Sequence, residues 1–231
     1  MIGIIGALDI EVAELCELMK NKKEKEISNI LFTEGEIEGV KCVAAVCGVG
    51  KVNAAICATA MIINYNPDCI INSGVAGGLK HGIGIGDIVV ADNVVQHDAD
   101  STAAGIPLGG VQINDETVIN IPCDSTIANR LFQSCQSLAD ISVFLGTIVT
   151  GDQFIEGKEK RKELHDNFNA LACEMEGGAI GHVCYKHKIP FGVLRAISDD
   201  MENDEFVDFA EFAPKAAANS IAAIRAFLHE I

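Results

Sequence analysis

Two acidic segments of the sequence contain side chains that could do chemistry together. Glu174 and Glu176 flank a methionine in CEMEGGAIGHVC (173–184), and an apolar face then recurs at helical spacing. This pattern predicts that both carboxylates lie where a strand gives way to a helix. Acids at a helix amino terminus are favoured by the helix dipole by about 0.3 to 1 kcal/mol. The pair alone therefore leaves a structural role and a functional role open.

The second segment, RAISDDM (195–201), favours the functional role. Here a polar Ser-Asp-Asp ends an apolar strand that includes Ile197. A carboxylate at such a strand end, such as Asp199, is expected to be partly desolvated. Desolvation favours the protonated form, which is the form that a general acid needs.

These side chains need a scaffold that brings them together. Apolar runs predict strands at 2–6, 69–72, 87–91, 141–150, 171–174 and 192–198, with two more around the turn-like Glu38-Gly39 within 29–46. Helical spacing predicts helices at 12–19, 52–63 and 125–137, one after Glu176, and one that closes the chain around 221–228. The alternation predicts a single α/β domain over residues 1–231, with a mixed, mostly parallel central sheet flanked by helices.

The predicted topology also locates the site. Ligands of open parallel sheets bind beyond the carboxyl ends of the strands, where loops converge. We expect this edge to carry Glu11 and the segments 73–78, 152–155, 174–177 and 198–200. Four of these five places hold a carboxylate, so mutual repulsion and burial should raise the proton affinity of some of them.

Composition excludes several function classes. The formal net charge of −16 argues against nucleic acid or an anionic membrane surface as a partner, because both are bound by clustered Lys and Arg. The nine cysteines are odd in number and never spaced as Cys-x-x-Cys, which is typical of buried thiols in a reducing compartment. The amino-terminal MIGIIGALDIEV has no basic region, so we expect a strand there and a cytoplasmic protein.

Four motifs that suggest cofactors or metals fail on inspection. CGVGKV (47–52) has Ala45 where a phosphate-binding loop needs glycine, and Val52 where it needs Ser or Thr. MIGIIGA lacks the three-glycine dinucleotide fingerprint. On a helix, His182 and Cys184 point to different faces, which disfavours a metal site with His187. The alternating acids of HDAD (97–100) are weak evidence for a hard cation. We expect no cofactor and no metal.

Together these segments resemble the 5′-methylthioadenosine/S-adenosylhomocysteine nucleosidases of the nucleoside phosphorylase superfamily. The resemblance covers nearly the whole chain and keeps the family's order. It rests on GIIGALDIEV (3–12), CGVGKVNAA (47–55), INSGVAGGL (71–79), GDIVVAD (86–92), HDAD (97–100), GDQFI (151–155), CEMEGGAIGHVC (173–184) and RAISD (195–199). The family hydrolyses the bond between adenine and a 5′-thio-substituted ribose without a metal or cofactor.

The resemblance implies roles for the acidic residues. Asp199 resembles the acid that protonates the purine N7, with Ser198 supporting it. Glu11 resembles the carboxylate that orients and deprotonates the attacking water, with Arg195 nearby. Glu176 matches the residue that binds the ribose hydroxyls, and Glu174 is expected to be shared between that task and capping of the helix.

It also implies a substrate pocket. Met175 matches the residue that packs on the sugar, Phe154 the one that stacks on adenine, and Ile155 the one whose backbone meets the base edge. The remaining pocket wall is expected from Leu8, Val49 and Phe209.

Two departures from the family pattern leave the 5′ substituent open. Members commonly have Ser where this chain has Val75, which removes a hydroxyl near the site. Many carry an aromatic residue after the HDAD segment that reaches across a dimer interface, where this chain has Ala104. Ser101, Ala104 and Ile106 would shape a different rim. Because HDAD segments of the family meet a neighbouring subunit, we expect a homodimer with the site near the interface.

Three alternative functions differ in what they require. A phosphorylase needs arginines for phosphate, but the chain has only four, at 130, 161, 195 and 225, and Glu11 would repel the anion. A non-catalytic nucleoside-binding protein should lack one of the three catalytic acids, yet Glu11, Glu176 and Asp199 are all present. A hydrolase of another purine nucleoside, of futalosine or 5′-deoxyadenosine type, stays open because of Val75.

Overall fold

The computed structural model describes residues 1–199 and 209–230, the side chains of residues 209 and 210 excepted. Its strands are β1 (Ile2–Gly6), β2 (Lys20–Ile27), β3 (Ile30–Ile37), β4 (Val40–Val46), β5 (Cys69–Gly78), β6 (Ile88–Gln96), β7 (Val111–Ile113), β8 (Glu116–Val118), β9 (Ile121–Pro122), β10 (Val143–Thr150), β11 (Ala170–Glu174) and β12 (Phe191–Asp199). Its helices are α1 (Asp9–Leu18), α2 (Lys51–Tyr65), the 3-10 turn η1 (Thr102–Ala104), α3 (Ser125–Gln136), α4 (Lys158–Phe168), α5 (Gly177–His187) and α6 (Phe209–His229). None of the described helices is long and apolar enough to cross a membrane.

Ten strands form one mixed sheet in the order β11-β10-β6-β12-β5-β1-β4-β3-β2, with β9 beside β6. Parallel pairing joins β4, β1, β5 and β12 at the centre, and β6, β10 and β11 beyond them. The pair β12 and β6 is antiparallel, and so are β3 with β4 and β2 with β3. The end of β11 also pairs with the end of β5, so β5, β12, β6, β10 and β11 close into a ring. The ring draws the carboxyl ends of β5, β11 and β12 close together.

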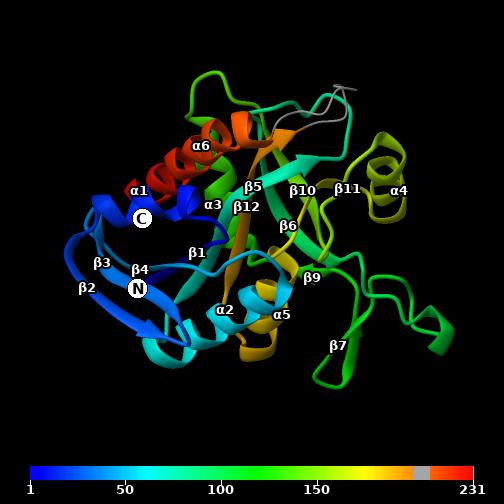
Figure 1. The fold of residues 1–231 in the computed structure, drawn as a ribbon, viewed down its shortest axis with the longest axis horizontal. Helices are drawn as coiled ribbons and strands as arrows, with labels where there is room; N and C mark the ends of the chain where they lie inside the picture. Colours follow the sequence, from blue (N-terminus) through cyan, green and yellow to red (C-terminus); the bar gives the residue numbers. More distant parts are fainter. Residues whose placement is uncertain (200–208, 231) are drawn as a thin grey trace.

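Helices cover both faces of the sheet (Figure 1). One core packs α2 and α5 against side chains such as Ile5, Ile70 and Val89. The other packs α1, α3 and α6 against their sequence neighbours Ile4, Ile71 and Val90. This alternation follows from the two-residue period of a strand, in which successive side chains point to opposite faces. The predicted fold class, a mixed sheet flanked by helices, is confirmed.

Several elements differ from the sequence prediction: β6 runs on to Gln96, the short strands β7 to β9 were not predicted, and three larger differences have clear physical reasons. The strand predicted at 69–72 continues to Gly78, so Ser73 to Gly78 are strand residues and not a loop. Strand β2 was not predicted because all of KNKKEKEI is exposed or half-buried and shows no apolar alternation. It lies at the edge of the sheet, where lysines discourage pairing with another chain. Helix α4 was also missed, because Leu164 and Phe168 are its only large apolar residues.

Candidate active site

A pocket of about 750 Å³, part of it open to solvent, lies at the carboxyl ends of β1, β5, β11 and β12. A concave pocket with a mostly apolar wall and a few converging polar groups suits a small organic ligand. Most of its wall is apolar, and four carboxylates enter it. The lining residues are Ala7, Leu8, Glu11, Val49, Val75, Ala76, Gly77, Gln153, Phe154, Ile155, Cys173, Glu174, Met175, Glu176, Ser198 and Asp199.

Glu11 is held in the pocket by backbone amides. It lies in the first turn of α1 and is only 3% exposed. Its Oε2 accepts hydrogen bonds from the N–H groups of Ala7 (2.7 Å) and Leu8 (2.9 Å), and its Oε1 accepts one from Val75 N–H (2.9 Å). Three fixed donors leave this carboxylate little freedom to rotate. Its orientation is therefore set before any ligand binds.

The predicted junction of strand and helix is confirmed, and it separates the two glutamates. Glu174 ends β11, and Glu176 is the N-cap residue of α5. The Oε2 atom of Glu174 accepts from the N–H groups of Glu176 (3.0 Å) and Gly177 (2.7 Å), while its Oε1 accepts from the Thr150 hydroxyl. Glu174 thus satisfies the amides of the N-cap residue Glu176 and of Gly177, while Gly178 N–H donates to the Thr150 hydroxyl (2.6 Å). Its capping role is shown by geometry.

Arg195 provides positive charge beneath these acids. Its side chain is 2% exposed, it forms an ion pair with Glu174, and its Nη2 also donates to Asn72 Oδ1 (2.6 Å). The same nitrogen lies 3.8 Å from Glu176 Oε2. Arg195 does not line the pocket, so it acts on the site through the carboxylates above it.

Glu176 is the acid whose proton affinity is most clearly changed. Its Oε1 accepts from Gly50 N–H (2.7 Å), and only 5% of the residue is exposed. Burial, followed by the neighbouring Glu174 carboxylate, raises the pKa of Glu176 to about 7, against the opposing effect of Arg195. The sequence-based expectation that crowding and burial would raise a proton affinity at this edge is met at Glu176. Near neutral pH this side chain can be charged or neutral.

Asp199 lies at the other end of the pocket. Its Oδ1 accepts a hydrogen bond from the Ser198 hydroxyl (2.8 Å), and its Oδ2 is paired with the guanidinium of Arg161. The sequence prediction considered burial alone at Asp199. The structure adds a buried cation from α4, Arg161, which lies in a charged run that by itself indicates a solvated surface.

Glycines in β5 make room for both acids. A Cβ atom at Gly74 would lie 2.5 Å from Glu11 Oε1 and 2.9 Å from Arg195 Nη1. A Cβ at Gly77 would lie 3.0 Å from Asp199 Oδ2 and 3.3 Å from Cys173 Sγ. Real Cβ atoms essentially never come as close as the first of these distances. The glycines therefore let two carboxylates reach the pocket over the end of one strand.

The turn before α2 is anchored to three neighbouring segments. Gly50 has φ +97°, which favours glycine, and its N–H faces Glu176. Lys51 N–H donates to Asp152 Oδ1 (2.8 Å), and Lys51 Nζ forms an ion pair with Asp98 Oδ1 (2.7 Å). Asp152 N–H in turn donates to Asp98 Oδ2 (2.9 Å). Asp98 of the HDAD segment thus helps to hold a turn that contacts Glu176.

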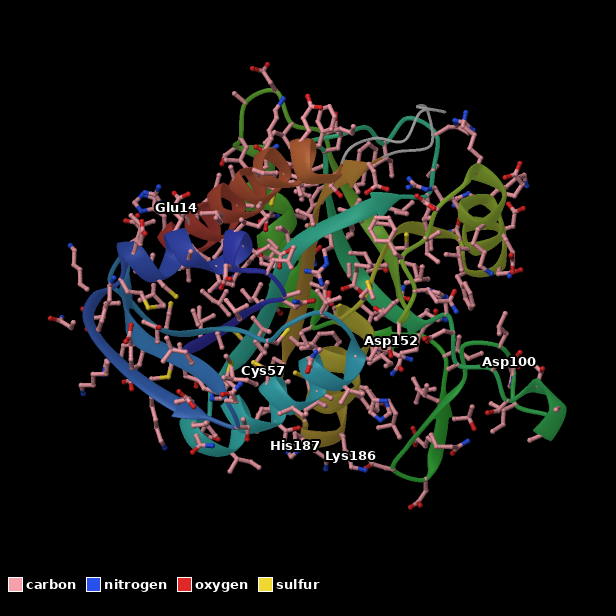
Figure 2. All side chains as sticks on the ribbon, viewed as in Figure 1. Glu14, Cys57, Asp100, Asp152, Lys186 and His187 are labelled. Atoms are coloured by element: carbon pink, nitrogen blue, oxygen red, sulfur yellow. The ribbon has the colours of Figure 1, made fainter. Side chains whose placement is uncertain are left out.

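Most of the other predicted site residues also line the pocket, namely Leu8, Val49, Val75, Phe154, Ile155, Met175 and Ser198. Phe154 and Val49 are 62% and 48% exposed at its rim. Phe209 begins α6, but its side chain lies outside the described residues. Ser101, Ala104 and Ile106 do not line this pocket. They belong to a segment that projects from the molecule near Asp100 (Figure 2).

Sequence reasoning missed several pocket residues. Ala7, Ala76, Gly77, Gln153 and Cys173 line the wall without having been named as site residues. Ala76, Gly77 and Gln153 fall within the segments 73–78 and 152–155 that were expected at this edge, and Ala7 and Cys173 each lie next to a named residue, so the quoted motifs already contained the signal. Arg161 gave no such signal, because it lies in the charged run KEKRKE.

No group of three or more metal-ligating side chains is found among the described residues. His182 contacts Gln96, at 3.2 Å between Nδ1 and Nε2, and Cys184 is buried in the core. His187 lies in the last turn of α5, away from Asp152 (Figure 2). The three side chains considered for a metal site thus have separate surroundings.

Comparison with known proteins places this geometry in a family. The family model described as the phosphorylase superfamily matches residues 1–229. The 5′-methylthioadenosine/S-adenosylhomocysteine nucleosidase of Shewanella sediminis is 40% identical over 231 residues, which is 100% of this chain and 99% of that protein.

Solved structures agree over the same length. The nucleosidase of that name from Neisseria meningitidis, in complex with methylthio-immucillin-A, is 33% identical with a TM-score of 0.92, over 100% of this chain and 99% of that one. A futalosine hydrolase mutant of Helicobacter pylori is 32% identical with a TM-score of 0.90, over 100% and 99% of the two chains. Similarity of fold alone therefore does not distinguish a 5′-methylthioadenosine/S-adenosylhomocysteine nucleosidase from a futalosine hydrolase.

Proposed function

Because the chain belongs to the 5′-methylthioadenosine/S-adenosylhomocysteine nucleosidase family of the phosphorylase superfamily, we propose that Asp199, Glu11 and Glu176 carry out its reaction. The enzyme is an N-glycosyl hydrolase that releases adenine and a 5′-thioribose from these two nucleosides. One observation carries the assignment of residues. Carboxylates from α1, from the β11 to α5 junction and from the end of β12 line one pocket.

Asp199 acts at the base end of the pocket, formed by Phe154, Ile155, Ser198 and Asp199. Adenine is a poor leaving group as an anion, so its N7 must gain a proton as the glycosidic bond stretches. A positioned acid contributes roughly 100- to 10,000-fold to such a step. Phe154 stacks on the base, and the Ile155 backbone meets its edge. Ser198 holds the Asp199 carboxylate in place.

Glu11 and Glu176 act at the sugar end, formed with Glu174 and Met175. As the bond breaks, the ribose becomes a cation of oxocarbenium type. Carboxylates fixed beside a centre that turns positive stabilise the transition state more than the ground state. Glu11 orients the water and takes its proton, and Glu176 binds the ribose hydroxyls. Glu174 contributes charge but is committed to α5 and Arg195, so its role is mainly to position Glu176.

A phosphorylase reaction is disfavoured by the charges around the pocket. No Lys or Arg occurs among its described lining residues. Arg195, the nearest guanidinium to the sugar end, is covered by Glu174 and Glu176. A phosphate dianion here would meet three carboxylates without a cation facing it.

The decisive experiment measures free base released from methylthioadenosine, S-adenosylhomocysteine, inosine and futalosine, each with and without phosphate. We expect adenine from the first two, at a rate that phosphate does not change. A phosphate requirement would overturn the hydrolase assignment. Faster release of hypoxanthine from futalosine than of adenine from methylthioadenosine would favour the second candidate, which the similarity to the Helicobacter pylori futalosine hydrolase keeps open.

We also propose that the enzyme is a symmetric homodimer with the pocket near the interface. Val52, Ile56 and Ile63 lie along one side of α2 and are 70%, 44% and 70% exposed. Val49, at the exposed rim of the pocket, lies in the turn that leads into α2. An apolar stripe of this kind beside a binding site is typical of a protein interface. Light scattering at working concentration should give twice the chain mass, and a monomer would contradict the proposal.

A cytoplasmic location is proposed from the cysteines. All nine are free in the structure, and seven of them are buried. Burial raises the pKa of several thiols, for example Cys42 to about 11. Inert, unpaired thiols suit a reducing compartment. Fractionation of the source cells should place the protein in the soluble fraction of the cytoplasm.

A further inference from the structure

Arg161 is a buried cation that the proposed mechanism does not yet use. It lies one turn into α4, and only 8% of the residue is exposed. The rest of this helix is charged and mostly solvent-facing, so burial of one arginine is costly unless its hydrogen bonds are satisfied.

The Arg161 guanidinium joins three segments that surround the base end. Its Nη2 pairs with Asp199 Oδ2 and also donates to the Ile155 carbonyl oxygen (3.4 Å), while its Nη1 donates to the Gly78 carbonyl oxygen (3.4 Å). These acceptors lie at the end of β12, in the loop before α4, and at the end of β5. Asp199 and Ile155 line the pocket, but Arg161 does not. It lies behind the acid, out of reach of a ligand.

We propose that Arg161 is a positioning residue for Asp199, an inference that rests on the proposed function. It fixes one carboxylate oxygen from behind while Ser198 holds the other. The carboxylate plane is thereby aimed at the base. Arg161 also stabilises the charge that remains when the reaction proceeds.

Arg161 can stabilise the Asp199 charge because of how charge moves during the reaction. The Asp199 proton passes to N7 of the base, and the electron pair of the breaking glycosidic bond passes into the purine ring. Asp199 is then a carboxylate beside Arg161, and a fixed guanidinium opposite a developing negative charge lowers the energy of that step. The pairing acts in the transition state more than on substrate binding, so its loss should appear in kcat.

The test is a double-mutant cycle on methylthioadenosine hydrolysis with the variants Arg161→Met, Asp199→Asn and both together. We expect Arg161→Met alone to lower kcat by roughly 10- to 100-fold, a part of what a positioned acid supplies, while KM changes by less than about threefold. In the Asp199→Asn background the same substitution should have little further effect, because the group through which it acts is gone. Arg161→Lys should recover part of the rate, because lysine keeps the positive charge but lacks the planar guanidinium that donates several hydrogen bonds in a fixed geometry.

Controls separate this role from a structural one. Lys162→Met removes an exposed cation from the same helix and should leave the rate unchanged. A loss of kcat that persists in the Asp199→Asn background would mean that Arg161 acts on the loop that carries Ile155 or on the fold as a whole. That result would overturn the inference. So would an unchanged rate in Arg161→Met. If the methionine variant does not fold, the cycle is run with Arg161→Lys, with the same criterion. Wild-type release of adenine, measured alongside, tests the proposed function separately.

Discussion

The two ends of the pocket differ in the balance between carboxylates and buried guanidinium groups. At the end proposed to hold the sugar, Glu174 and Glu176 surround the buried guanidinium of Arg195, and Glu11 lies beside it across Gly74. At the end proposed to hold the base, Asp199 pairs with Arg161. Among the described residues, the sugar end therefore carries an excess of negative charge, while the base end is closer to balance.

The difference matches what each end has to do. A ribose that turns into a cation is stabilised by negative charge that is already in place, so an excess of carboxylate there lowers the barrier. A base that must be protonated needs a group that can give up a proton and then exist as an anion, and a nearby cation supports that anion. Each substitution below tests whether the ends can be separated in this way.

The largest effects are expected from the acids themselves. Asp199→Asn removes the proposed proton donor at the base end and should lower kcat by roughly 100- to 10,000-fold. Glu11→Gln keeps the shape of the side chain but removes the base proposed to activate water, and a loss of similar size is expected. Steady-state adenine release measures both.

Folding must be intact for these losses to be interpreted. Asp199→Asn should melt close to the wild type, whereas Glu11→Gln must turn its amide nitrogen towards a backbone N–H and should remain folded but melt at a somewhat lower temperature. Glu14→Gln, on the exposed side of α1 (Figure 2), is the matched control for Glu11 and should retain full activity. Wild-type rates in either Asp199→Asn or Glu11→Gln would refute the role assigned to that residue.

The glycines of β5 allow the two ends to be disturbed separately. Gly74→Ala places a Cβ 2.5 Å from Glu11 Oε1, so the carboxylate must move, whereas Gly77→Ala places one 3.0 Å from Asp199 Oδ2. We expect a loss of kcat of about 100-fold or more for Gly74→Ala and about 10-fold for Gly77→Ala, because a small misplacement of catalytic groups is costly. A crystal structure of each variant would show which carboxylate moved. A larger loss in Gly77→Ala would reverse the predicted ranking of the two ends.

Glu176 should leave a signature in stability. Its pKa is raised to about 7 in the folded protein, so the native state holds a proton that the unfolded chain releases near pH 4.5. The unfolding free energy contributed by this group therefore falls as pH rises from about 4.5 through 7. Glu176→Gln, which mimics the protonated form, should match the wild type at pH 5 and exceed it at pH 8 by about 1 to 3 kcal/mol.

Denaturant unfolding at both pH values measures this difference. Glu116→Gln, an exposed glutamate of β8, should show no such divergence from the wild type. If the Glu176→Gln and wild-type stabilities differ by the same amount at pH 5 and pH 8, Glu176 is not held near neutrality at the sugar end.

The sequence predicted the sugar end more completely than the base end. Glu11 and Glu176 come after strands whose apolar runs are plain, Glu174 ends one of these strands, and the helix after Glu176 shows clear periodicity. Arg161 could not be found in this way, because its partners Gly78, Ile155 and Asp199 lie far from it in the chain or at loop ends. A charged segment such as KEKRKELHDNF normally predicts a solvated surface, and only the fold shows that one of its cations is buried.

The prediction of a loop at the glycines of β5 was wrong for a related reason. In SGVAGG, three glycines favour a loop when read locally, yet β5 continues through them. The strand tolerates them because β12 pairs along it and because Glu11 and Asp199 occupy the space that side chains would take. That compensation comes from residues at 11 and 199, and no local pattern contains it.

The smallest effect is expected from Lys51, which reaches the sugar end only through other groups. Its ion pair with Asp98 helps to hold the turn whose Gly50 N–H contacts Glu176. A partly exposed pair of this kind contributes about 1 kcal/mol or less, so Lys51→Met should lower kcat/KM by about two- to fivefold. Lys186→Met, in the last turn of α5 (Figure 2), should have no effect. A 100-fold loss in Lys51→Met would instead place Lys51 among the groups that meet the substrate, and the sugar end would no longer be defined by carboxylates alone.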